Sequence, residues 1–288
     1  MLKINISIMI PIWVDMGHGE HQYPEHIEHP GRLPPILDTL KDCPVRFHIR
    51  EDPVLRDSTF TIKRSSKIKG DCYWTAYTAD LLKRGTQMIE QACTALHTCA
   101  FVLIRPPGHH SDSTGSAEGF CHQNNAWIAV QTLKELGTKK ITILDWDAHH
   151  GDGTEDCVLK GGYPDVQFCS IHAYGSGVYP GTGKAKHTST ILNIPLPVGT
   201  KSRTYERCFN DVVMPWIMKD VPEVLIVSAG YDGHWKDPMK LLELDESVFK
   251  YMSIKLKEIG CRVLFLLEGG YNPNVLAACV KATLEPWF

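Results

Sequence analysis

Eight short apolar segments constrain the fold of this chain more strongly than any other feature of its sequence. The longer ones are apolar throughout and do not alternate with polar residues, so both faces of the strands are expected to be buried. Helical patterns separate most of them, which indicates a parallel sheet with helices on both faces. The sequence therefore predicts a three-layer α/β/α fold around an eight-stranded, mainly parallel sheet. The expected strands are residues 6–13, 45–49, 101–104, 141–144, 166–172, 191–196, 224–227 and 262–267.

The segments between these strands carry helical signals. Apolar residues recur at spacings of three and four between residues 73 and 96, which is typical of an amphipathic helix, with Gly85 as a possible break. A length of 288 residues allows one large α/β domain or two smaller ones, and we expect a single domain over residues 1–288. The other expected helices are residues 34–41, 124–136, 203–218 and 245–259, and a last helix that Pro273 opens.

The segment DWDAHHGDGT directly follows the apolar strand at residues 141–144. Its residues Asp145, Asp147 and His149 alternate, so an extended backbone would point all three side chains to the same side. Two carboxylates and an imidazole suit a divalent metal such as Zn²⁺, which keeps one position open for water in catalytic sites. A hydrogen-bonded turn is the alternative interpretation, but five ionisable groups within eight residues argue against it.

Polar residues also follow three other strands, where each strand ends. They are His109 and His110, Asp232, and Tyr271. Because the carboxyl ends of parallel strands meet at one edge of a sheet, these residues are expected to form a single site with the DWDAHHGDGT segment.

The combined residues favour metal-assisted hydrolysis of an amide or an ester. Asp147, His149 and Asp232 can supply three ligands and leave a position for water, whose pKa the metal would lower. His110 can act as general base and then as acid for the leaving amine.

The remaining residues would assist this step. His109 and His110 each need an orienting carboxylate, for which Asp145 and Asp152 are the nearest candidates. Tyr271 follows two glycines and can donate its hydroxyl to the developing oxyanion.

The motifs RPPGHH, GFCxxNN, DWDAHHGDGT, SIHxY…YPGTG, SAGYDxxxxDP and LEGGY occur in this order and resemble the zinc-dependent histone deacetylase family. The resemblance runs from about His29-Pro30 to the C-terminus, and DWDAHHGDGT and LEGGY look more like the class II branch and bacterial homologues than class I. It implies an arginase–deacetylase fold, a single deacetylase catalytic domain, and hydrolysis of N-acetyl-lysine in a protein or peptide substrate. It assigns the metal ligands, the histidine pair with its carboxylates, and the carbonyl-polarising tyrosine to the residues named above.

The resemblance also implies substrate-binding residues. Phe120 and Tyr179 match the aromatic pair that walls the acyl-lysine tunnel, with Gly119 beside Phe120; core packing is the alternative, but both rings sit in loops beside catalytic motifs. Asp71 matches the rim aspartate that holds the substrate backbone. Met239 stands where polyamine-type members carry a gatekeeping glutamate.

Two kinds of metal ion are expected from the resemblance. One catalytic Zn²⁺ would be bound per chain, with Fe²⁺ as the alternative. A structural K⁺ would take Asp145 and Ser170 as its side-chain ligands, with backbone oxygens completing the site.

Composition limits the partners and the compartment. A net charge of −3 gives no basic surface for nucleic acid. The ten cysteines form no CxxC pair and several lie in apolar runs, which is typical of reduced thiols in a cytoplasmic or nuclear protein rather than a secreted one. The apolar run at residues 4–13 is too short to span a bilayer and lacks a clear cleavage site, so no membrane association is expected.

Three other functions are alternatives. An arginase-type ureohydrolase needs a second metal and further carboxylates, and His150 in DAHHGD departs from the DAHxD pattern of that family. A non-catalytic acetyl-lysine binder would lack a ligand, a histidine or the tyrosine, and this sequence has all of them. An acetylpolyamine amidohydrolase would share every catalytic residue. Met239 is neutral and offers no attraction to a polycation, which favours acyl-lysine peptides, although Glu243 lies nearby in sequence. The sequence leaves the acyl length and the oligomeric state open.

Overall fold

The structure is a computed structural model that describes residues 9–15, 17, 21–50 and 71–288. Its centre is a nine-stranded sheet in the order β2-β1-β3-β9-β8-β4-β5-β7-β6. All neighbouring strands are parallel except β6, which runs antiparallel to β7. The strands are β1 (Ile10–Asp15), β2 (Val45–Arg50), β3 (Cys99–Leu103), β4 (Ile141–Asp145), β5 (Val166–Ala173), β6 (Lys186–His187), β7 (Ile191–Leu196), β8 (Val224–Ala229) and β9 (Arg262–Leu267).

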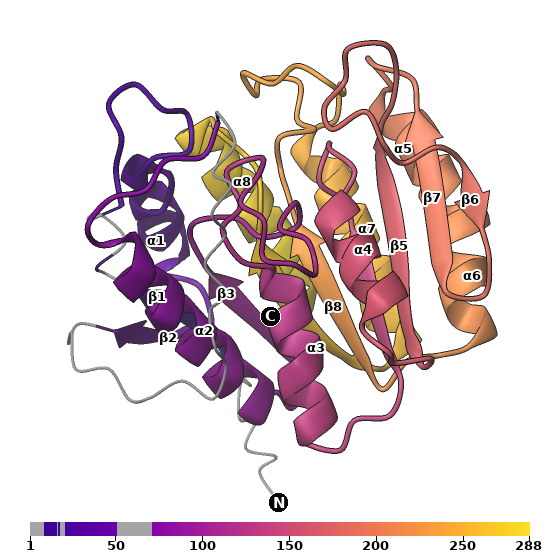
Figure 1. The fold of residues 1–288 in the computed structure, drawn as a ribbon, viewed down its shortest axis with the longest axis horizontal. Helices are drawn as coiled ribbons and strands as arrows, with labels where there is room; N and C mark the ends of the chain where they lie inside the picture. Colours follow the sequence, from indigo (N-terminus) through magenta and orange to yellow (C-terminus); the bar gives the residue numbers. More distant parts are fainter. Residues whose placement is uncertain (1–8, 16, 18–20, 51–70) are drawn as a thin grey trace, which may run out of the picture.

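Helices cover both faces of this sheet (Figure 1). In that view α2, α3 and α4 lie in front of the sheet, and α7 and α8 lie behind it. The predicted three-layer α/β/α architecture with a mainly parallel sheet is therefore confirmed. The helices are α1 (Pro34–Leu40), α2 (Thr78–Thr94), α3 (Asn125–Glu135), α4 (Asp152–Lys160), α5 (Ser202–Cys208), α6 (Met214–Lys219), α7 (Glu246–Ile259) and α8 (Pro273–Leu284).

The sheet has nine strands where eight were predicted. The additional strand, β6, has two residues, Lys186 and His187, and no apolar run that would reveal it. It pairs antiparallel with the neighbouring β7, and Lys186 also forms an ion pair with Glu155 at 2.7 Å. The first strand, expected at residues 6–13, is described from Ile10 to Asp15, and residues 6–8 of that prediction lie outside the described residues.

Two helix predictions need correction. Gly85 does not interrupt α2, which runs unbroken and buries this glycine. The predicted helix at residues 203–218 is instead α5 and α6 joined by a π-helical turn, η3 (Phe209–Val213). Pro215, in the first turn of α6, has no backbone N–H to donate to the carbonyl four residues earlier, which accounts for the loosened turn there.

The core has two apolar clusters, one on each face of the sheet, because successive side chains of a strand point to opposite faces. In β4, Ile143 joins the cluster under α2 and α3, whereas Leu144, together with Trp146 just after the strand, joins the cluster under α7 and α8. The strand that leads into the DWDAHHGDGT segment is therefore fixed from both sides. No helix in the described part of the chain combines the length and apolar character that crossing a lipid bilayer requires.

Candidate active site

The carboxyl ends of β4, β8 and β9 lie side by side at one edge of the sheet, because these strands are neighbours and parallel. β4 ends at Asp145, whose partners across the sheet are Ser170 in β5 and Ser228 in β8. The loop after β3 brings two adjacent histidines to the same edge, since β3 runs parallel to β9. The structure thus assembles these strand ends as the sequence analysis expected.

Asp147, His149 and Asp232 form a buried cluster. Each offers one ligand atom within 4.8 Å of the other two. The Nδ1 atom of His149 lies 3.0 Å from Asp147 Oδ1 and 2.8 Å from Asp232 Oδ2. Among the described residues, Asp232 Oδ2 is buried and has no hydrogen bond of proper geometry despite that short contact. Two buried carboxylates that converge on one imidazole nitrogen fit a shared cation.

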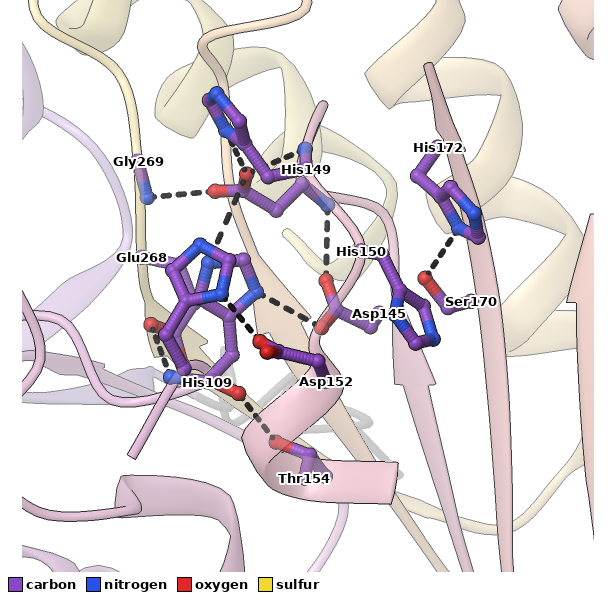
Figure 2. A network of polar contacts seen from close by, with 12 residues as sticks. His109, Asp145, His149, His150, Asp152, Thr154, Ser170, His172, Glu268 and Gly269 are labelled. Carbon is purple, nitrogen blue, oxygen red and sulfur yellow. Dashed lines mark hydrogen bonds and ion pairs between the residues drawn. The ribbon is translucent and has the colours of Figure 1, made fainter. Parts of the chain in front are cut away.

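Backbone N–H groups hold both carboxylates from outside the cluster. Ala148 N–H donates to Asp232 Oδ1 at 3.0 Å. Gly269 N–H, which is labelled in Figure 2, donates to Asp147 Oδ2 at 2.9 Å. A side chain at residue 269 would not fit, because its Cβ would lie 2.5 Å from Asp147 Oδ2 and 2.8 Å from Asp232 Cγ. The glycine is required for this close approach of backbone to carboxylate.

The electrostatics of the cluster favour a cation. Burial and the nearby charge of Asp147 raise the pKa of Asp232. Burial alone would lower the pKa of His149, but the carboxylates of Asp232 and Asp147 outweigh it and raise this pKa to about 10. A positive charge is therefore strongly preferred here. Two oxygens and one nitrogen that leave room for water suit a catalytic Zn²⁺ or a related divalent ion.

Two histidine–carboxylate pairs lie beside this cluster. His109 Nδ1 is 3.0 Å from Asp145 Oδ2, and His110 Nδ1 is 2.7 Å from Asp152 Oδ1. In Figure 2, His109 lies between Glu268 on one side and Asp145 on the other. The Nε2 atom of His109 is 3.8 Å from Asp147 Oδ1, so this ring faces the candidate metal cluster. The structure thus joins both predicted histidines to their predicted carboxylates.

The two histidines differ in charge. Burial would lower the pKa of His109, but Asp147 and Asp145 hold it well above its usual value. Burial and the charge on His109 lower the pKa of His110 to about 4, although Asp152 opposes this shift. A divalent cation in the cluster would also repel a proton on His110. His110 is therefore uncharged at neutral pH and can accept a proton.

Side chains without a predicted role fix the turn that carries Tyr271. Glu268 Oε2 accepts hydrogen bonds from Gly108 N–H at 2.6 Å and from His109 N–H at 3.2 Å. Arg32 donates to the carbonyls of Glu268 and Gly270, the latter at 2.7 Å. The only sequence signal for Glu268 is a charged residue that directly follows an apolar strand.

Asp237 is a further residue without a predicted role, and it holds the same turn. Its carboxylate accepts from the Tyr271 N–H at 2.7 Å. Arg32 pairs locally with Glu28 at 3.1 Å, but the two carbonyls that it holds in the Tyr271 turn lie more than 200 residues away, so its role has no local sequence signal.

The predicted substrate-binding aromatic residues flank the cluster. The Phe120 ring meets the Tyr271 ring edge-on at 5.7 Å, and the Tyr179 ring lies 5.0 Å from His110 and 6.3 Å from His149. Gly119, at φ +53°, packs against the rings of His110 and Tyr179: an added Cβ would lie 2.3 Å from His110 Cδ2 and 3.0 Å from Tyr179 Cε1. These positions are compatible with the predicted tunnel, whose role stays a prediction.

Asp71 and Met239 lie further out. Asp71 is exposed, and its carbonyl accepts from His26 Nε2 at 3.3 Å; the His26 ring in turn lies 4.7 Å from Phe120. Met239 is half-buried, and its N–H donates to Asp237 Oδ1 at 3.0 Å. The roles suggested for both residues stay predictions.

A model of the histone deacetylase domain matches residues 26–286 of this chain. The chain belongs to the histone deacetylase domain family. The resemblance stated from the motifs is therefore confirmed. Membership of this family implies a metal ion, and the cluster of Asp147, His149 and Asp232 is the candidate for holding it.

Several relatives are curated histone deacetylases. Histone deacetylase 15 of Arabidopsis thaliana is 31% identical over 271 residues, which are 89% of this chain and 48% of that protein. Histone deacetylase 10, chloroplastic, of Oryza sativa subsp. japonica is 37% identical over 197 residues, which are 64% of this chain and 43% of that protein. An uncharacterized protein of Methanocaldococcus jannaschii is 30% identical over 298 residues, 93% of this chain and 84% of its own. The chain thus spans about half the length of these two curated deacetylases.

Solved structures agree with the fold. The crystal structure of the HDA15 HD domain matches with a TM-score of 0.84 at 26% identity, over 96% of this chain and 90% of that chain. A crystal structure of acetylpolyamine aminohydrolase from Burkholderia pseudomallei gives a TM-score of 0.82 at 19% identity, over 96% and 98% of the two chains. The second likeness concerns the fold alone.

Gly269 provides a test of the candidate metal centre. Replacing it by Ala should displace Asp147 and Asp232, because the new Cβ enters their space. We expect the affinity for Zn²⁺ to fall by about 10–100-fold, the usual effect of losing a residue that orients metal ligands. Gly175→Ala is the matched control, since its Cβ would meet nothing closer than 3.8 Å. Equal zinc affinity of the two variants in a competitive chelator titration would contradict this account of the site.

Proposed function

We propose that this chain is a metal-dependent hydrolase that removes acetyl groups from lysine side chains in proteins or peptides, with one catalytic Zn²⁺. One observation carries the proposal: a buried Asp–His–Asp cluster lies beside two histidine–carboxylate pairs and the turn of Tyr271. Relatives that are named histone deacetylases support it. The same donor set accepts Fe²⁺ as the alternative ion.

A second group of potential metal ligands lies nearby, but its chemistry does not suit a second metal ion. His109, Cys121 and Glu268 also bring ligand atoms within 4.8 Å of one another. However, burial and the charge of Glu268 hold the pKa of the Cys121 thiol well above its usual value, and burial raises the pKa of Glu268 to about 7. His109 already uses Nδ1 for Asp145. This group is therefore a poor match for the second metal of an arginase-type enzyme.

When bound, a divalent ion would lower the pKa of a water molecule and polarise the substrate carbonyl. His110 would accept the proton of the attacking water at Nε2, because Asp152 accepts from Nδ1–H and fixes that tautomer. The same nitrogen then donates the proton to the leaving lysine amine.

Tyr271 would donate its hydroxyl to the carbonyl oxygen as that atom gains negative charge. Burial and the Asp232 carboxylate hold the pKa of this phenol well above 10, so it remains a donor at neutral pH. His109, positively charged beside Asp145, would add electrostatic stabilisation.

We also propose the structural K⁺ site at Asp145 and Ser170. His172 Nε2–H donates to the Gly183 carbonyl at 2.9 Å, so Nδ1 of this ring accepts from the Ser170 hydroxyl at 2.8 Å. The Ser170 hydrogen is thus directed to His172, and the lone pairs of its oxygen are left for a cation. We expect added KCl to raise the melting temperature more than choline chloride at equal ionic strength, and Ser170→Ala to remove that difference. An identical KCl effect in both proteins would contradict this site.

A reducing compartment, cytoplasm or nucleus, is proposed for the protein. All ten cysteines are free, and most are buried. Fractionation of the source cells that finds the protein only in an oxidising compartment would contradict this.

Acetyl-lysine peptides are the proposed substrates rather than acetylpolyamines. Met239 offers no negative charge to a polycation. Glu243 is exposed, and its Oε2 lies 3.7 Å from Lys201 Nζ, so its charge is already paired. We expect kcat/KM for the best acetyl-lysine peptide to exceed that for acetylspermidine. The reverse order would assign the chain to the polyamine function, and no turnover of either class would remove the proposal.

His110 is the proposed proton carrier, so its replacement by Ala should lower kcat at least ~10²-fold, the usual scale of general acid–base catalysis. Zinc content should stay at the parent value, because His110 is not one of the proposed ligands. His187→Ala, at an exposed position in β6, is the control and should leave kcat unchanged. Near-parent turnover of His110→Ala would show that another group carries the proton.

A further inference from the structure

We propose that Asp237 positions Tyr271 for catalysis, although it touches neither metal ligand nor substrate in this account. The inference rests on the proposed deacetylation, since it concerns the tyrosine that would polarise the carbonyl. Asp237 lies in the loop between β8 and α7, five residues after the proposed metal ligand Asp232, and it is 1% exposed.

Both carboxylate oxygens of Asp237 accept backbone hydrogen bonds. Oδ2 accepts from Tyr271 N–H at 2.7 Å and from Asn272 N–H at 3.3 Å. Oδ1 accepts from Met239 N–H at 3.0 Å. One carboxylate therefore joins its own loop to the turn that enters α8, more than 30 residues away.

The Tyr271 turn needs such a restraint. Two glycines precede the tyrosine, and Gly270 has φ +115°. Glycine can adopt many backbone conformations around this one, so the turn is not fixed by its own residues. Gly269 N–H is held by Asp147, and the Gly270 carbonyl accepts from Arg32 at 2.7 Å. Asp237 is the described residue that binds the N–H of Tyr271 itself. This contact fixes the peptide group from which the Tyr271 side chain departs, and so it limits where the phenol can lie.

The loop also links the position of the metal to the position of the Tyr271 hydroxyl, and the proposed reaction requires both to reach the substrate carbonyl oxygen. Asp232 at one end would bind the metal, and Asp237 at the other end holds the backbone N–H of Tyr271. Within the loop, Asp237 N–H donates to the His234 carbonyl at 2.8 Å and His234 N–H donates to the Tyr231 carbonyl at 3.2 Å. A compact loop thus spaces the metal from the phenol, and both must reach the same carbonyl oxygen. A misplacement of about 1 Å can lower a rate ~10²-fold.

Burial of Asp237 is hard to explain by packing alone. Its carboxylate lies in the field of Asp232, and a buried charge near a like charge is unfavourable unless hydrogen bonds compensate. Three N–H donors offset part of this cost, but burial and Asp232 still raise the pKa of Asp237 to about 7. In Asp237→Asn one oxygen becomes an NH₂ group, so a donor would face either Met239 N–H or the N–H pair of the Tyr271 turn.

A double-mutant cycle with Tyr271→Phe tests the proposal. We expect Asp237→Asn to lower kcat about 10–100-fold with little change in KM and with parent zinc content. In the Tyr271→Phe background, Asp237→Asn should lower kcat less than ~2-fold, because the hydroxyl that it positions is absent. An equal loss in both backgrounds, or no loss in Tyr271→Phe alone, would overturn the positioning role.

Asp245→Asn is the matched control. Asp245 ends the same loop and caps α7 by accepting from Ser247 N–H at 2.9 Å. Because Asn caps a helix about as well as Asp, Asp245→Asn should leave stability and kcat near the parent values in both backgrounds. A loss of kcat with Asp245→Asn as large as with Asp237→Asn would show that removing either carboxylate from this loop has the same effect.

A readout without turnover separates this inference from the proposed function. A crystal structure of zinc-loaded Asp237→Asn should show the Tyr271 hydroxyl displaced by about 1 Å or more, with Asp147, His149 and Asp232 in place. An unmoved hydroxyl would overturn the inference. A parent enzyme that turns over neither acetyl-lysine peptides nor acetylpolyamines would overturn the proposed function, whatever the position of the hydroxyl.

Discussion

The site depends on the burial of two carboxylates, Asp147 and Asp232, beside the single imidazole of His149. Buried charges are costly unless they are paired, and backbone N–H groups from Ala148 and Gly269 satisfy only part of this need. The remaining negative charge raises the pKa of His149 to about 10, so the cluster attracts a cation. The need to compensate these buried charges accounts for Gly269, which lets its N–H reach Asp147, and for the proposed metal chemistry at the strand ends.

The same charges make two adjacent histidines chemically different. His109 faces Asp145 and Asp147, which stabilise its charged form. Burial and the charge of His109 lower the pKa of His110 to about 4, and its single, partly exposed partner Asp152 does not reverse this shift. His109 can therefore serve as electrostatic stabiliser and His110 as proton acceptor, because each ring is hydrogen-bonded to a different carboxylate. The proposed division of labour rests on this asymmetry.

Much of this arrangement could be predicted from local sequence. Continuous apolar runs mark strands buried on both faces, and polar residues after such runs must meet where parallel strands end; Asp145, Asp147 and Asp232 were located in this way. The two-residue strand β6 and the helix α4, whose first residues are Asp152 and Gly153, lack an apolar pattern and were missed. The roles of Glu268, Asp237 and Arg32 depend on hydrogen bonds to distant backbone, and no local pattern in the sequence identifies those partners.

Zinc stoichiometry tests the central claim most directly, because the account requires one strongly cation-selective cluster. Elemental analysis after equilibration with limiting to excess Zn²⁺ should approach one tightly bound ion per chain. Asp232→Asn should reduce that value towards zero, whereas Asp237→Asn, which lies outside the cluster, should retain it. Two tightly bound ions per chain, or full zinc binding by Asp232→Asn, would contradict the account.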